Sequence, residues 1–588
     1  MSTTTRLALA VRVLIALCTR TFFQPDEYFQ SLEPAHHAVF GYAHLTWEWL
    51  APKPIRSIIY PALNIPIFWT LKALALSETW IGAWLLIYIP RMLHGTLAAA
   101  TDIWLCEIAR RWLGSQYVST ALFLSLTSFF HSLSLSRSLS NSLETSLTTI
   151  AFAHYPWDAS SHLSPQLIYN SSRMKTTLIF SALACAARPT NAVIWFYLYG
   201  KLFWFLRSSR RTVRALFLQV VTIGLIAVLS LFALDSLYYQ KPTLTPLNFL
   251  LTNLSSVSLF YGSNSWHYYL TQALPILCTT ALPFVLHGMW SVVFDRHAAA
   301  LRNMFTAVVW CIGCYSMAGH KEWRFIHPIL PLLHIFAAKS LVDLSDRGST
   351  KERKIANKRA VEPRPFIQRF IYSLPPIRKG FLIFLSLTIP ASLYVVLFYC
   401  SAPISVLSYV RSLPVNDLRN GGIGFLMPCH STPGHAYIHR KDLASGKMWT
   451  LGCEPPLQYV ASCPSVLVSP RDEPNNHRNQ NLPTYRDQTD VFFHSPVEYL
   501  QSRFPAHVNL SFPLSPFPSS ISGAPAPDGY PWAHEWPRYL VFFGTLLEEE
   551  GVQNLLEAKG YGEVWRKGRS WEGEGLRKGG VRVWKWRG

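Results

Sequence analysis

Charged residues are scarce in this chain. Asp, Glu, Lys and Arg make up 15% of its 588 residues, against roughly 25% in an ordinary soluble domain, whereas 50% of the residues are hydrophobic and 14% are aromatic. The formal net charge of +20 would suit a nucleic-acid-binding protein, but such a protein concentrates Lys and Arg on one binding face. Here the basic residues cluster between apolar segments, as in the cytoplasmic loops of membrane proteins. We therefore expect no nucleic-acid partner and a chain that crosses a membrane many times.

A cleavable signal sequence, internal repeats and a zinc-ligand set are also missing. The apolar run at 7–18 contains Arg12 and is followed by no small-residue cleavage site, so we expect a retained first span whose Arg12 faces other helices. The two halves of the chain are not similar, whereas transporters often contain repeats, so a transporter is the less favoured function. No set of His and Cys residues has the complete spacing of a zinc site, and we expect no metal.

Ten further apolar stretches are either about 20 residues long, the length needed to cross a bilayer, or consist of two shorter apolar runs. They lie at 80–108, 117–135, 139–153, 176–187, 190–206, 213–237, 274–294, 303–319, 326–343 and 380–400. The sequence thus predicts an all-α polytopic membrane protein with about 11 transmembrane helices over residues 1–400, with a first polar loop at about 20–79. Residues 55–76 are apolar too, but Pro61 and Pro66 would break a helix there. We interpret this stretch as an interfacial or re-entrant segment.

The distribution of Lys and Arg orients the spans. Basic loops favour the cytoplasmic side, and an eleven-span alternation from a cytoplasmic N-terminus places all four there: Arg110 and Arg111; Arg207, Arg210, Arg211 and Arg214; Arg296 and Arg302; and the ten Lys or Arg at 347–379. The same alternation places five polar segments on the opposite side: "QPDEYFQ", "SRSLSNSLE", "RPTN", "FYGSNSWHYY" and "GHKEWRF". These segments hold most of the groups able to do chemistry, which indicates one functional face.

Asp26 and Glu27 in the first of these segments allow two interpretations. Acidic residues after a proline often begin a helix, where they favour the positive end of its dipole. The loop also shares its side of the membrane with cationic residues, and a carboxylate base near such residues suits transfer from an anionic phosphate donor.

The remaining candidates have structural alternatives as well. Glu322 lies among three residues that either form ion pairs at a membrane boundary or bind an anion: His320, Lys321 and Arg324. Trp266 and His267 suit either an aromatic interface belt or a sugar site.

Asn141 and Glu144 lie one turn apart at the start of an apolar stretch. A Glu at such a place needs a partner or a function, and Arg188 in "RPTN" is a candidate partner.

The composition changes after residue 400, where Pro, Ser, Gly and charged residues increase. We expect residues 401–588 to form a small mixed α/β domain on the non-cytoplasmic side. Disulfides persist there, and Cys429 is expected to pair with Cys453 or with Cys463. The sequons at Asn253 and Asn509 would be accessible to glycosylation, whereas the one at Asn170 would be cytoplasmic and unused. Alternating apolar and basic residues at 581–586 predict an edge strand.

Several segments resemble one family. The stretch "TFFQPDEYFQSLEPAHHAVFGYAHLTWEW" is similar to the first luminal loop of the dolichol-phosphate-mannose-dependent α-mannosyltransferases of glycosyltransferase family 22. The resemblance continues through "SLSNSLETSLTT", "ARPTNA" and "GHKEWRFIHPILPL". The resemblance also includes "CEPP" in the tail, and two further segments resemble more narrowly the members that act in glycosylphosphatidylinositol (GPI) anchor synthesis: "FYGSNSWHYYLTQALP" and "LMPCHSTP". Residues 465–535 contain no motif of this kind.

This resemblance implies a GT-C type fold in the endoplasmic reticulum membrane with a luminal active site. It implies transfer of mannose from dolichol-phosphate-mannose, through an α-1,2 bond, to a GPI precursor that already carries two mannoses. The donor mannose is β-linked to phosphate, so an α product requires inversion and one base that deprotonates the acceptor hydroxyl. We expect Asp26 to be this base and Glu27 to orient the acceptor or hold the loop, although the two adjacent residues are exchangeable.

The resemblance also implies roles for the other candidates. His320, Lys321 and Arg324 would bind the donor phosphate, and the remaining substrate-binding candidates are Glu322, Trp266, His267, Arg188, Asn141 and Glu144. The chain has no Asp-x-Asp motif, and a lipid monophosphate needs little charge neutralisation, so we expect neither metal nor cofactor. Alternatives are a related enzyme that acts on the lipid-linked N-glycan precursor or adds the fourth GPI mannose, and, outside the family, a transporter or a non-catalytic membrane scaffold. The sequence does not indicate whether a partner subunit is needed.

Overall fold

The computed structural model divides the chain into two compact units, each built from segments far apart in the sequence. It describes residues 2–159, 172–254, 257–260, 262–295, 298–346, 375–444, 446–455, 486–515 and 532–588. The first, which we call the helical unit, comprises Met1–Thr19, Tyr88–Pro242 and Ser263–Leu397. The second, the loop–tail unit, comprises Arg20–Ile87, Thr243–Gly262 and Phe398–Gly588. This division cuts across the boundary expected near residue 400, because the first polar loop belongs with the tail.

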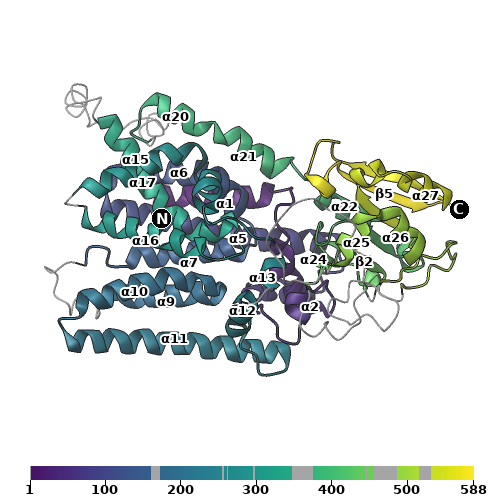
Figure 1. Ribbon diagram of the computed structural model, residues 1–588, viewed down its shortest axis with the longest axis horizontal. Coiled ribbons are helices and arrows are strands. Elements are labelled where there is room, and N and C mark those ends of the chain that lie inside the picture. Colours follow the sequence, from purple (N-terminus) through teal and green to yellow (C-terminus); the bar gives the residue numbers. More distant parts are fainter. Residues whose placement is uncertain are drawn as a thin grey trace. The chain divides into compact units, whose positions relative to one another are not determined.

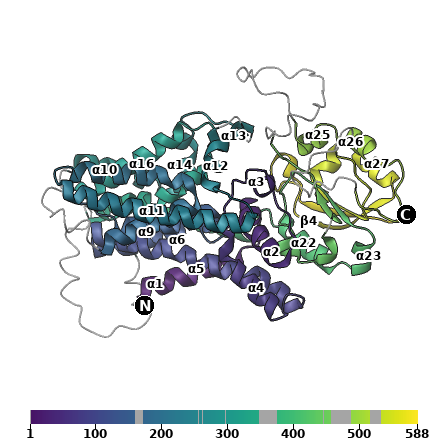
Figure 2. The ribbon, with the colours of Figure 1, turned by 90° about the horizontal axis from the view of Figure 1, so that it is seen from below.

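The helical unit contains helix in every one of the eleven stretches predicted as spans. Its elements are α1 (Thr3–Cys18), most of α5 (Trp80–Trp112), η3 (Ser115–Tyr117), α6 (Val118–Thr127), η4 (His131–Leu135), α7 (Ser140–His154), α9 (Ser172–Ala187), η5 (Pro189–Asn191), α10 (Ala192–Leu206), α11 (Arg210–Tyr239), η6 (Tyr269–Ala273), α14 (Leu274–Cys278), η7 (Thr279–Ala281), α15 (Leu282–Phe294), α16 (Ala299–Ser316), η8 (Trp323–Ile329), α17 (Leu330–Asp346), α20 (Lys379–Ser386) and α21 (Thr388–Leu397). Helices α9, α10 and α11 run side by side (Figure 1), and α10 also packs against α16 (Figure 2).

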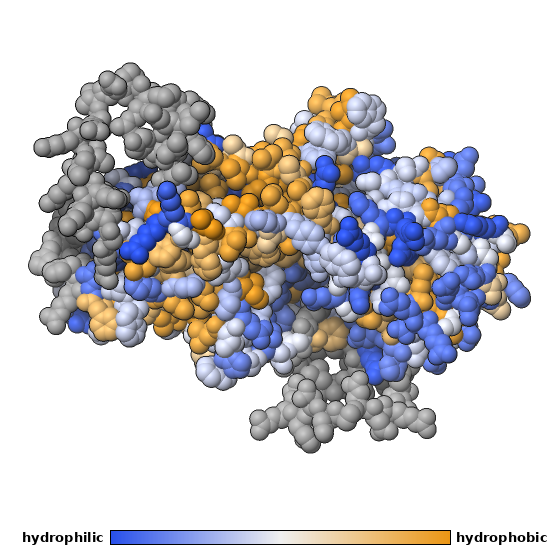
Figure 3. Space-filling model, turned by 90° about the horizontal axis from the view of Figure 1, so that it is seen from above, coloured by the Kyte–Doolittle hydropathy of each residue, from blue (hydrophilic) through white to orange (hydrophobic). Residues whose placement is uncertain are grey.

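Four helical runs among the described residues are long and apolar enough to cross a membrane: Arg210–Tyr239, Tyr269–Phe294, Trp323–Asp346 and Lys379–Ser412. The count of eleven spans therefore stays a prediction. Helix α11 leaves most of its apolar surface exposed, including Leu218, Leu225 and Leu229. Hydrophobic side chains cover much of the surface of the helical unit (Figure 3). Such a surface suits contact with lipid rather than water.

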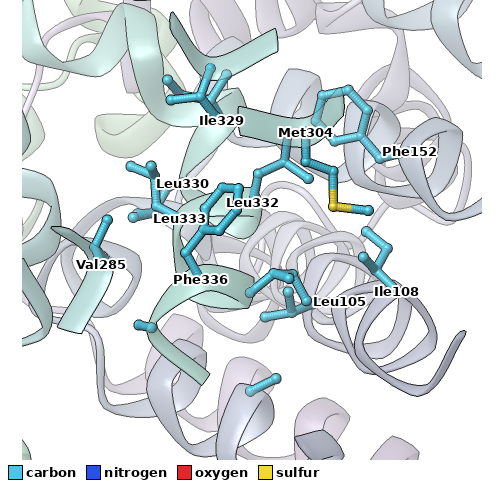
Figure 4. Packing of buried hydrophobic residues seen from close by; sticks show 14 of the residues in the cluster. Leu105, Ile108, Phe152, Val285, Met304, Ile329, Leu330, Leu332, Leu333 and Phe336 are labelled. Atoms are coloured by element: carbon cyan, nitrogen blue, oxygen red, sulfur yellow. The ribbon is translucent and has the colours of Figure 1, made fainter. Parts of the chain in front are cut away.

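Helix α17 forms the centre of the helical unit. Nearly all of its spanning window is buried, and its side chains pack with those of α5, α7, α15 and α16; the residues labelled in Figure 4 are Leu105, Ile108, Phe152, Val285, Met304, Ile329, Leu330, Leu332, Leu333 and Phe336. Gly288 of α15 permits this approach, because a Cβ there would lie 2.1 Å from the backbone oxygen of Phe336. Small residues are typical of close helix contacts in membranes.

An ion pair crosses the interior of the helical unit. Arg12 of α1 donates to both carboxylate oxygens of Asp102 in α5, at 2.7 and 2.9 Å, and both residues are 0% exposed. The same guanidinium donates to the backbone oxygen of Ser125, whose hydroxyl donates to Asp102 at 2.6 Å. The prediction that Arg12 faces other helices is confirmed. Because each charge has a partner, the pair fixes α1 against α5 and α6.

The loop–tail unit contains a five-stranded mixed sheet in the order β2-β1-β3-β5-β4. Its strands are β1 (Ile423–Leu426), β2 (Met448–Thr450), β3 (Tyr539–Phe543), β4 (Tyr561–Lys567) and β5 (Val581–Trp586). The pairs β1–β2 and β1–β3 are parallel, and β5 pairs antiparallel with both β3 and β4. The prediction that 581–586 is an edge strand is therefore wrong, because β5 pairs with β3 on one side and with β4 on the other. The predicted mixed α/β character of the tail is confirmed.

The loop–tail unit also contains many short helices. They are α2 (Glu33–Phe40), α3 (Trp47–Leu50), η2 (Pro61–Leu63), α4 (Ile65–Ala73), α12 (Thr245–Leu254), α13 (Val257–Phe260), α22 (Ala402–Ser412), α23 (Val415–Arg419), α24 (His435–Ile438), η9 (Lys441–Leu443), α25 (Gln488–His494), α26 (Pro496–Arg503), η10 (Gly544–Glu548), α27 (Val552–Ala558) and η11 (Gly575–Arg577). Phe492, Leu500 and Leu556 pack from three of these helices against Phe542 of the sheet. Helix α4 has nine residues, too few to cross a bilayer core of about 30 Å, as expected for the stretch at 55–76.

Glu33 joins the first loop to the tail inside the loop–tail unit. One carboxylate oxygen accepts from the backbone N–H of His44 at 2.8 Å, and the other accepts from that of Ala436 at 2.6 Å. The residue is fully buried. A Cβ on Gly434 would lie 2.8 Å from the carboxyl carbon of Glu33, so glycine is required for this approach. Beside it, the ring nitrogens of His36 and His439 are hydrogen-bonded at 2.8 Å.

Breaking the Arg12–Asp102 pair from one side should destabilise the helical unit. Arg12→Leu leaves the Asp102 carboxylate buried without its cation, at an expected cost of about 3–5 kcal/mol. Thermal unfolding in detergent should show a large loss for Arg12→Leu, a partial recovery in Arg12→Leu/Asp102→Leu, and little change for the exposed control Arg211→Leu. Equal losses in Arg12→Leu and the control would contradict the assignment.

The stability of the loop–tail unit should depend on the protonation of Glu33. Burial raises the pKa of Glu33 to about 7, although four backbone N–H groups act in the opposite direction. A carboxyl whose pKa is raised on folding stabilises the fold fully below its unfolded pKa, near pH 4.5, and this stabilisation is lost as the pH rises through 7.

Glu33→Gln removes this titration and places an amide N–H against backbone donors, at an expected cost of about 1–3 kcal/mol. The difference in melting temperature between the parent protein and Glu33→Gln should therefore narrow between pH 5 and pH 8. Glu549→Gln changes an exposed glutamate of the same unit and should follow the parent at every pH. A difference that stays constant with pH would contradict the titration of Glu33.

Candidate active site

Asp26 and Glu27 begin a helical run that extends over residues 26–40. The run continues through η1 (Tyr28–Leu32), a π-helical segment, into α2, which ends at Gly41 in the left-handed region with φ of 81°. The expected acidic helix start is thus present. π-Helical turns inside helices occur frequently at functional sites, so the helix start and a chemical role are compatible.

The two carboxylates differ in burial. Glu27 is 4% exposed, whereas Asp26 is half-buried. The pKa of Tyr60 lies well above 10 because of burial and, further, the nearby charge of Glu27. Glu27 therefore belongs to the packed interior of the loop, whereas the Asp26 side chain is partly exposed.

Residues that the sequence reasoning missed hold this helical run. Gln30 donates to Glu48 at 3.3 Å, and Arg56 donates to the other oxygen of Glu48 at 2.6 Å. The indole of Trp49 donates to the backbone oxygen of Phe29 at 2.9 Å. The "TWEW" stretch had been matched to the family as a motif, but its spacing gave no sign that it braces the helix beginning at Asp26.

The helical unit contains a buried polar network at the start of α7. We define it by Ser140, Asn141, Glu144, Thr148, Arg188, Asn191 and Trp195. Arg188 donates to the hydroxyl of Ser140 at 3.0 Å and to Asn141 at 3.3 Å, and its Nε lies 3.4 Å from a carboxylate oxygen of Glu144. The structure thus brings Arg188 to Glu144, the partner considered from the sequence.

Asn191 completes the network around Glu144. Its amide donates to Glu144 at 2.9 Å and to the hydroxyl of Thr148 at 3.0 Å, while its oxygen accepts from the indole of Trp195 at 2.6 Å. The amide nitrogen and the oxygen of Asn191 are thus both hydrogen-bonded to buried groups. Asn191 was not a candidate from the sequence, although it belongs to the same "RPTN" segment as Arg188.

The "HKEWRF" segment forms a compact charge cluster around Glu322. Arg324 donates to both carboxylate oxygens of Glu322, through Nε and, at 3.0 Å, through Nη2. His320 Nε2 lies 3.2 Å from the same carboxylate. Burial alone would raise the pKa of Glu322, but Arg324 and His320 outweigh it and hold that pKa well below 4.5. Glu322 is therefore a carboxylate that orients two cationic or proton-donating groups.

Lys321 does not join this charge cluster. Its ammonium donates to the backbone oxygen of Asn264 at 2.7 Å, and the Asn264 amide donates back to the Lys321 oxygen at 2.8 Å. These bonds tie the "SNSW" loop to the "HKEW" loop. Trp266 is 71% exposed, and His267 is hydrogen-bonded to Thr271 at 3.1 Å. The two aromatic candidates for the sugar site are thus not part of the polar clusters.

The buried polar network and the Glu322 cluster meet within the helical unit. The Asn141 amide donates to the backbone oxygen of Arg324 at 3.4 Å, and the Arg188 guanidinium lies 5.5 Å from the ring centre of Phe325. Arg188 and Arg324 are both mostly buried. Two guanidinium groups and two carboxylates are therefore held in defined orientations by these contacts, an arrangement suited to binding an anionic group.

The described cysteine and glycosylation candidates belong to the loop–tail unit. A disulfide joins Cys429 and Cys453, with Cα atoms 5.9 Å apart. Asn253 and Asn509 are exposed, and the Ser511 hydroxyl donates to the Asn509 side chain at 2.8 Å. Cys463 and Asn170 lie outside the described residues.

In the described part of the chain, one cluster of three potential metal ligands is found: Cys429, His430 and Cys453. The disulfide joins the two cysteines of this cluster. Cys311 and Cys314 in α16 have C-x-x-C spacing that the sequence reasoning left out. Their thiols are free, but no third ligand group gathers with them among the described residues.

Comparisons with known proteins assign the family. A sequence model of the Alg9-like mannosyltransferase family matches residues 3–439. "GPI mannosyltransferase 3" of Aspergillus fumigatus is 32% identical over 98% of this chain and 76% of its own length. "GPI mannosyltransferase 3" of Yarrowia lipolytica is 32% identical over 85% of this chain and 83% of its own length. "GPI alpha-1,2-mannosyltransferase 3" of mouse is 31% identical over 86% of this chain and 79% of its own length.

Solved structures support the fold. ArnT from Cupriavidus metallidurans bound to undecaprenyl phosphate has a TM-score of 0.50 and 12% identity, covering 76% of this chain and 85% of that chain. At this identity the likeness concerns the fold alone, which is of the predicted GT-C type. The family predicted from the loop motifs is confirmed, since the match covers most of the chain. The chain belongs to the Alg9-like mannosyltransferase family and is a glycosyltransferase.

Proposed function

We propose that the chain transfers mannose from dolichol-phosphate-mannose to a GPI precursor that carries two mannoses, forming an α-1,2 bond. The names of the Aspergillus, Yarrowia and mouse relatives support the reaction. The observation that carries the proposal is the joined set of oriented charges around Arg188 and Arg324, buried in an otherwise apolar bundle. Charges inside a membrane protein are costly and mark substrate sites when they are retained.

The donor side of the reaction is assigned to the Glu322 cluster. As the bond between the mannose anomeric carbon and phosphate oxygen breaks, negative charge develops on the departing dolichyl phosphate. Arg324 presents planar N–H donors suited to phosphate oxygens, and His320 can donate from the same side of Glu322. Glu322 positions both groups. Lys321 contributes positive charge and holds the neighbouring loop through Asn264.

The acceptor side is assigned to Asp26. Inversion requires a single displacement in which the acceptor hydroxyl attacks the anomeric carbon and loses its proton to a base. Asp26 is half-buried and can be reached, whereas Glu27 is packed beside Tyr60. Asp26 is therefore the base, and Glu27 positions it through the packed loop.

The remaining features complete the proposal. The enzyme lies in the endoplasmic reticulum membrane with its reaction on the luminal side, and needs neither metal nor cofactor. Its partners are the two lipid substrates. A related acceptor, either the lipid-linked N-glycan precursor or the GPI precursor that receives the fourth mannose, is the alternative within the same family.

Removing the base should abolish transfer while leaving the protein folded. Asp26→Asn is expected to lower the initial rate by roughly 100- to 10,000-fold, the usual contribution of a general base, and Glu27→Gln by less. The assay measures the α-1,2-mannosylated product in microsomes at matched expression, from dolichol-phosphate-mannose and the two-mannose precursor. Glu549→Gln serves as the control.

Two results would change this assignment. If Glu27→Gln loses the product while Asp26→Asn remains active, Glu27 is the base instead of Asp26. A parent enzyme that extends another lipid-linked mannoside, and not the two-mannose GPI precursor, would overturn the acceptor.

Replacing Arg324 by Lys should weaken donor use. Lys keeps the charge but loses the two-point contact with Glu322, so we expect kcat/KM for dolichol-phosphate-mannose to fall by roughly 10- to 100-fold. Initial rates over a range of donor concentrations check this. Arg207→Lys, in which an arginine stacked 3.9 Å over Trp204 is replaced, should keep parent kinetics. An unchanged donor dependence in Arg324→Lys would remove Arg324 from the donor site.

A further inference from the structure

A basic cavity lies at the end of α7 remote from the polar network. It has a volume of about 370 Å³ and is lined by the start of α1, the last turns of α5, the end of α7 and the first residues of α9. This size is within the range of roughly 300–1,000 Å³ that holds small molecules. Glu144 and His154 are ten residues apart on α7, so the cavity is roughly 15 Å along the helix from Glu144. It belongs to neither the donor nor the acceptor assignment.

Three arginines converge on this cavity: Arg110, Arg111 and Arg173. Glu107 is the acidic residue of the lining and forms an ion pair with Arg110. Arg111 is held in place by a hydrogen bond to the Ala153 oxygen at 3.3 Å and by stacking 4.8 Å over Trp112. Its guanidinium is repelled by Arg173 and attracted by Asp158 and Glu107. The excess of positive charge in a concave site favours an anion.

The start of α1 adds donors to the same cavity. Helix α1 has 16 residues, Ser2 caps it by accepting from the Thr5 N–H, and its first turn holds no acidic residue. Ser2, Thr4 and Thr5 line the cavity, and the Ser2 hydroxyl is hydrogen-bonded to those of Thr4 and Thr5, each at 2.8 Å. A helix N-terminus carries positive partial charge, which here adds to the charge of the arginines. Figure 2 marks this end of α1 with the letter N.

We propose that the basic cavity binds a phosphate ester, the headgroup of an anionic phospholipid or a soluble phosphate compound, at the membrane surface opposite the reaction. Arg110 and Arg111, in the last turn of α5, are among the basic residues that the charge distribution assigns to the cytoplasmic side. Anionic lipids are enriched in that leaflet. The site is a second phosphate site that is separate from those of dolichol-phosphate-mannose and the acceptor.

The test uses the full-length protein in nanodiscs of phosphatidylcholine, with or without phosphatidylinositol 4-phosphate. Native mass spectrometry of retained lipid and thermal unfolding provide two measurements. We expect Arg111→Gln/Arg173→Gln to retain the anionic lipid at least tenfold more weakly than the parent. Arg210→Gln/Arg211→Gln, which changes two exposed arginines of another predicted cytoplasmic loop, is the matched control and should retain it as the parent does. Mannose transfer in phosphatidylcholine alone should be unchanged in both.

Further measurements distinguish a lipid phosphate from a soluble phosphate, and test whether the site exists at all. Stabilisation of the detergent-solubilised parent by inorganic phosphate, absent in the cavity variant, would support the site and assign it to a soluble ligand. Arg173→Glu alone changes an exposed residue, so it keeps the test open if the double variant does not fold, and it should also lose the lipid. Equal retention by the parent, Arg173→Glu and the control would overturn the proposal.

Discussion

A charge inside an apolar helical bundle must have a partner, and this constraint organises the helical unit. Arg12 and Asp102 form a buried ion pair with two hydrogen bonds, and Ser125 is a third member of this group. The second buried pair, Arg188 and Glu144, is made differently: its shortest ionic contact is 3.4 Å, and amide and hydroxyl groups provide the closer hydrogen bonds. The first pair suits a structural connection, because it leaves no geometry to change. The second holds its charges by several contacts, of which the ionic one is the longest.

The loop–tail unit follows another rule, in which backbone groups rather than charges satisfy a buried carboxylate. Glu33 has no cation beside it and is held by N–H groups from two segments about 400 residues apart in the chain. Gly434 is needed only because the carboxylate comes so close. The helical run that contains Asp26 is thereby fixed to the tail at its middle, and is also held by Glu48 and Arg56 from its own loop.

Much of this could be predicted from the sequence where a pattern reflects one dominant force. Apolar length predicted helix in all eleven stretches, because burial in lipid requires it. The need of Glu144 for a partner predicted Arg188. Strand order could not be predicted, since the alternation at 581–586 does not reveal that β4 and β3 pair on either side of β5. Nor could the contact of Lys321 with Asn264, because a backbone oxygen leaves no trace in the sequence. Glu33 resembled an ordinary helix residue, and its role depends on a glycine far away in the chain.

The contact between Glu33 and Gly434 has a consequence for exchanging parts between related enzymes. The first loop and the tail are separated by almost the entire membrane region in sequence, yet they share one carboxylate and its backbone donors. They therefore form one structural module whose two parts lie far apart in the sequence. A hybrid built by transplanting only the tail would bring a foreign backbone to Glu33 and leave the helix of Asp26 without its anchor, so functional chimaeras require both halves from the same parent.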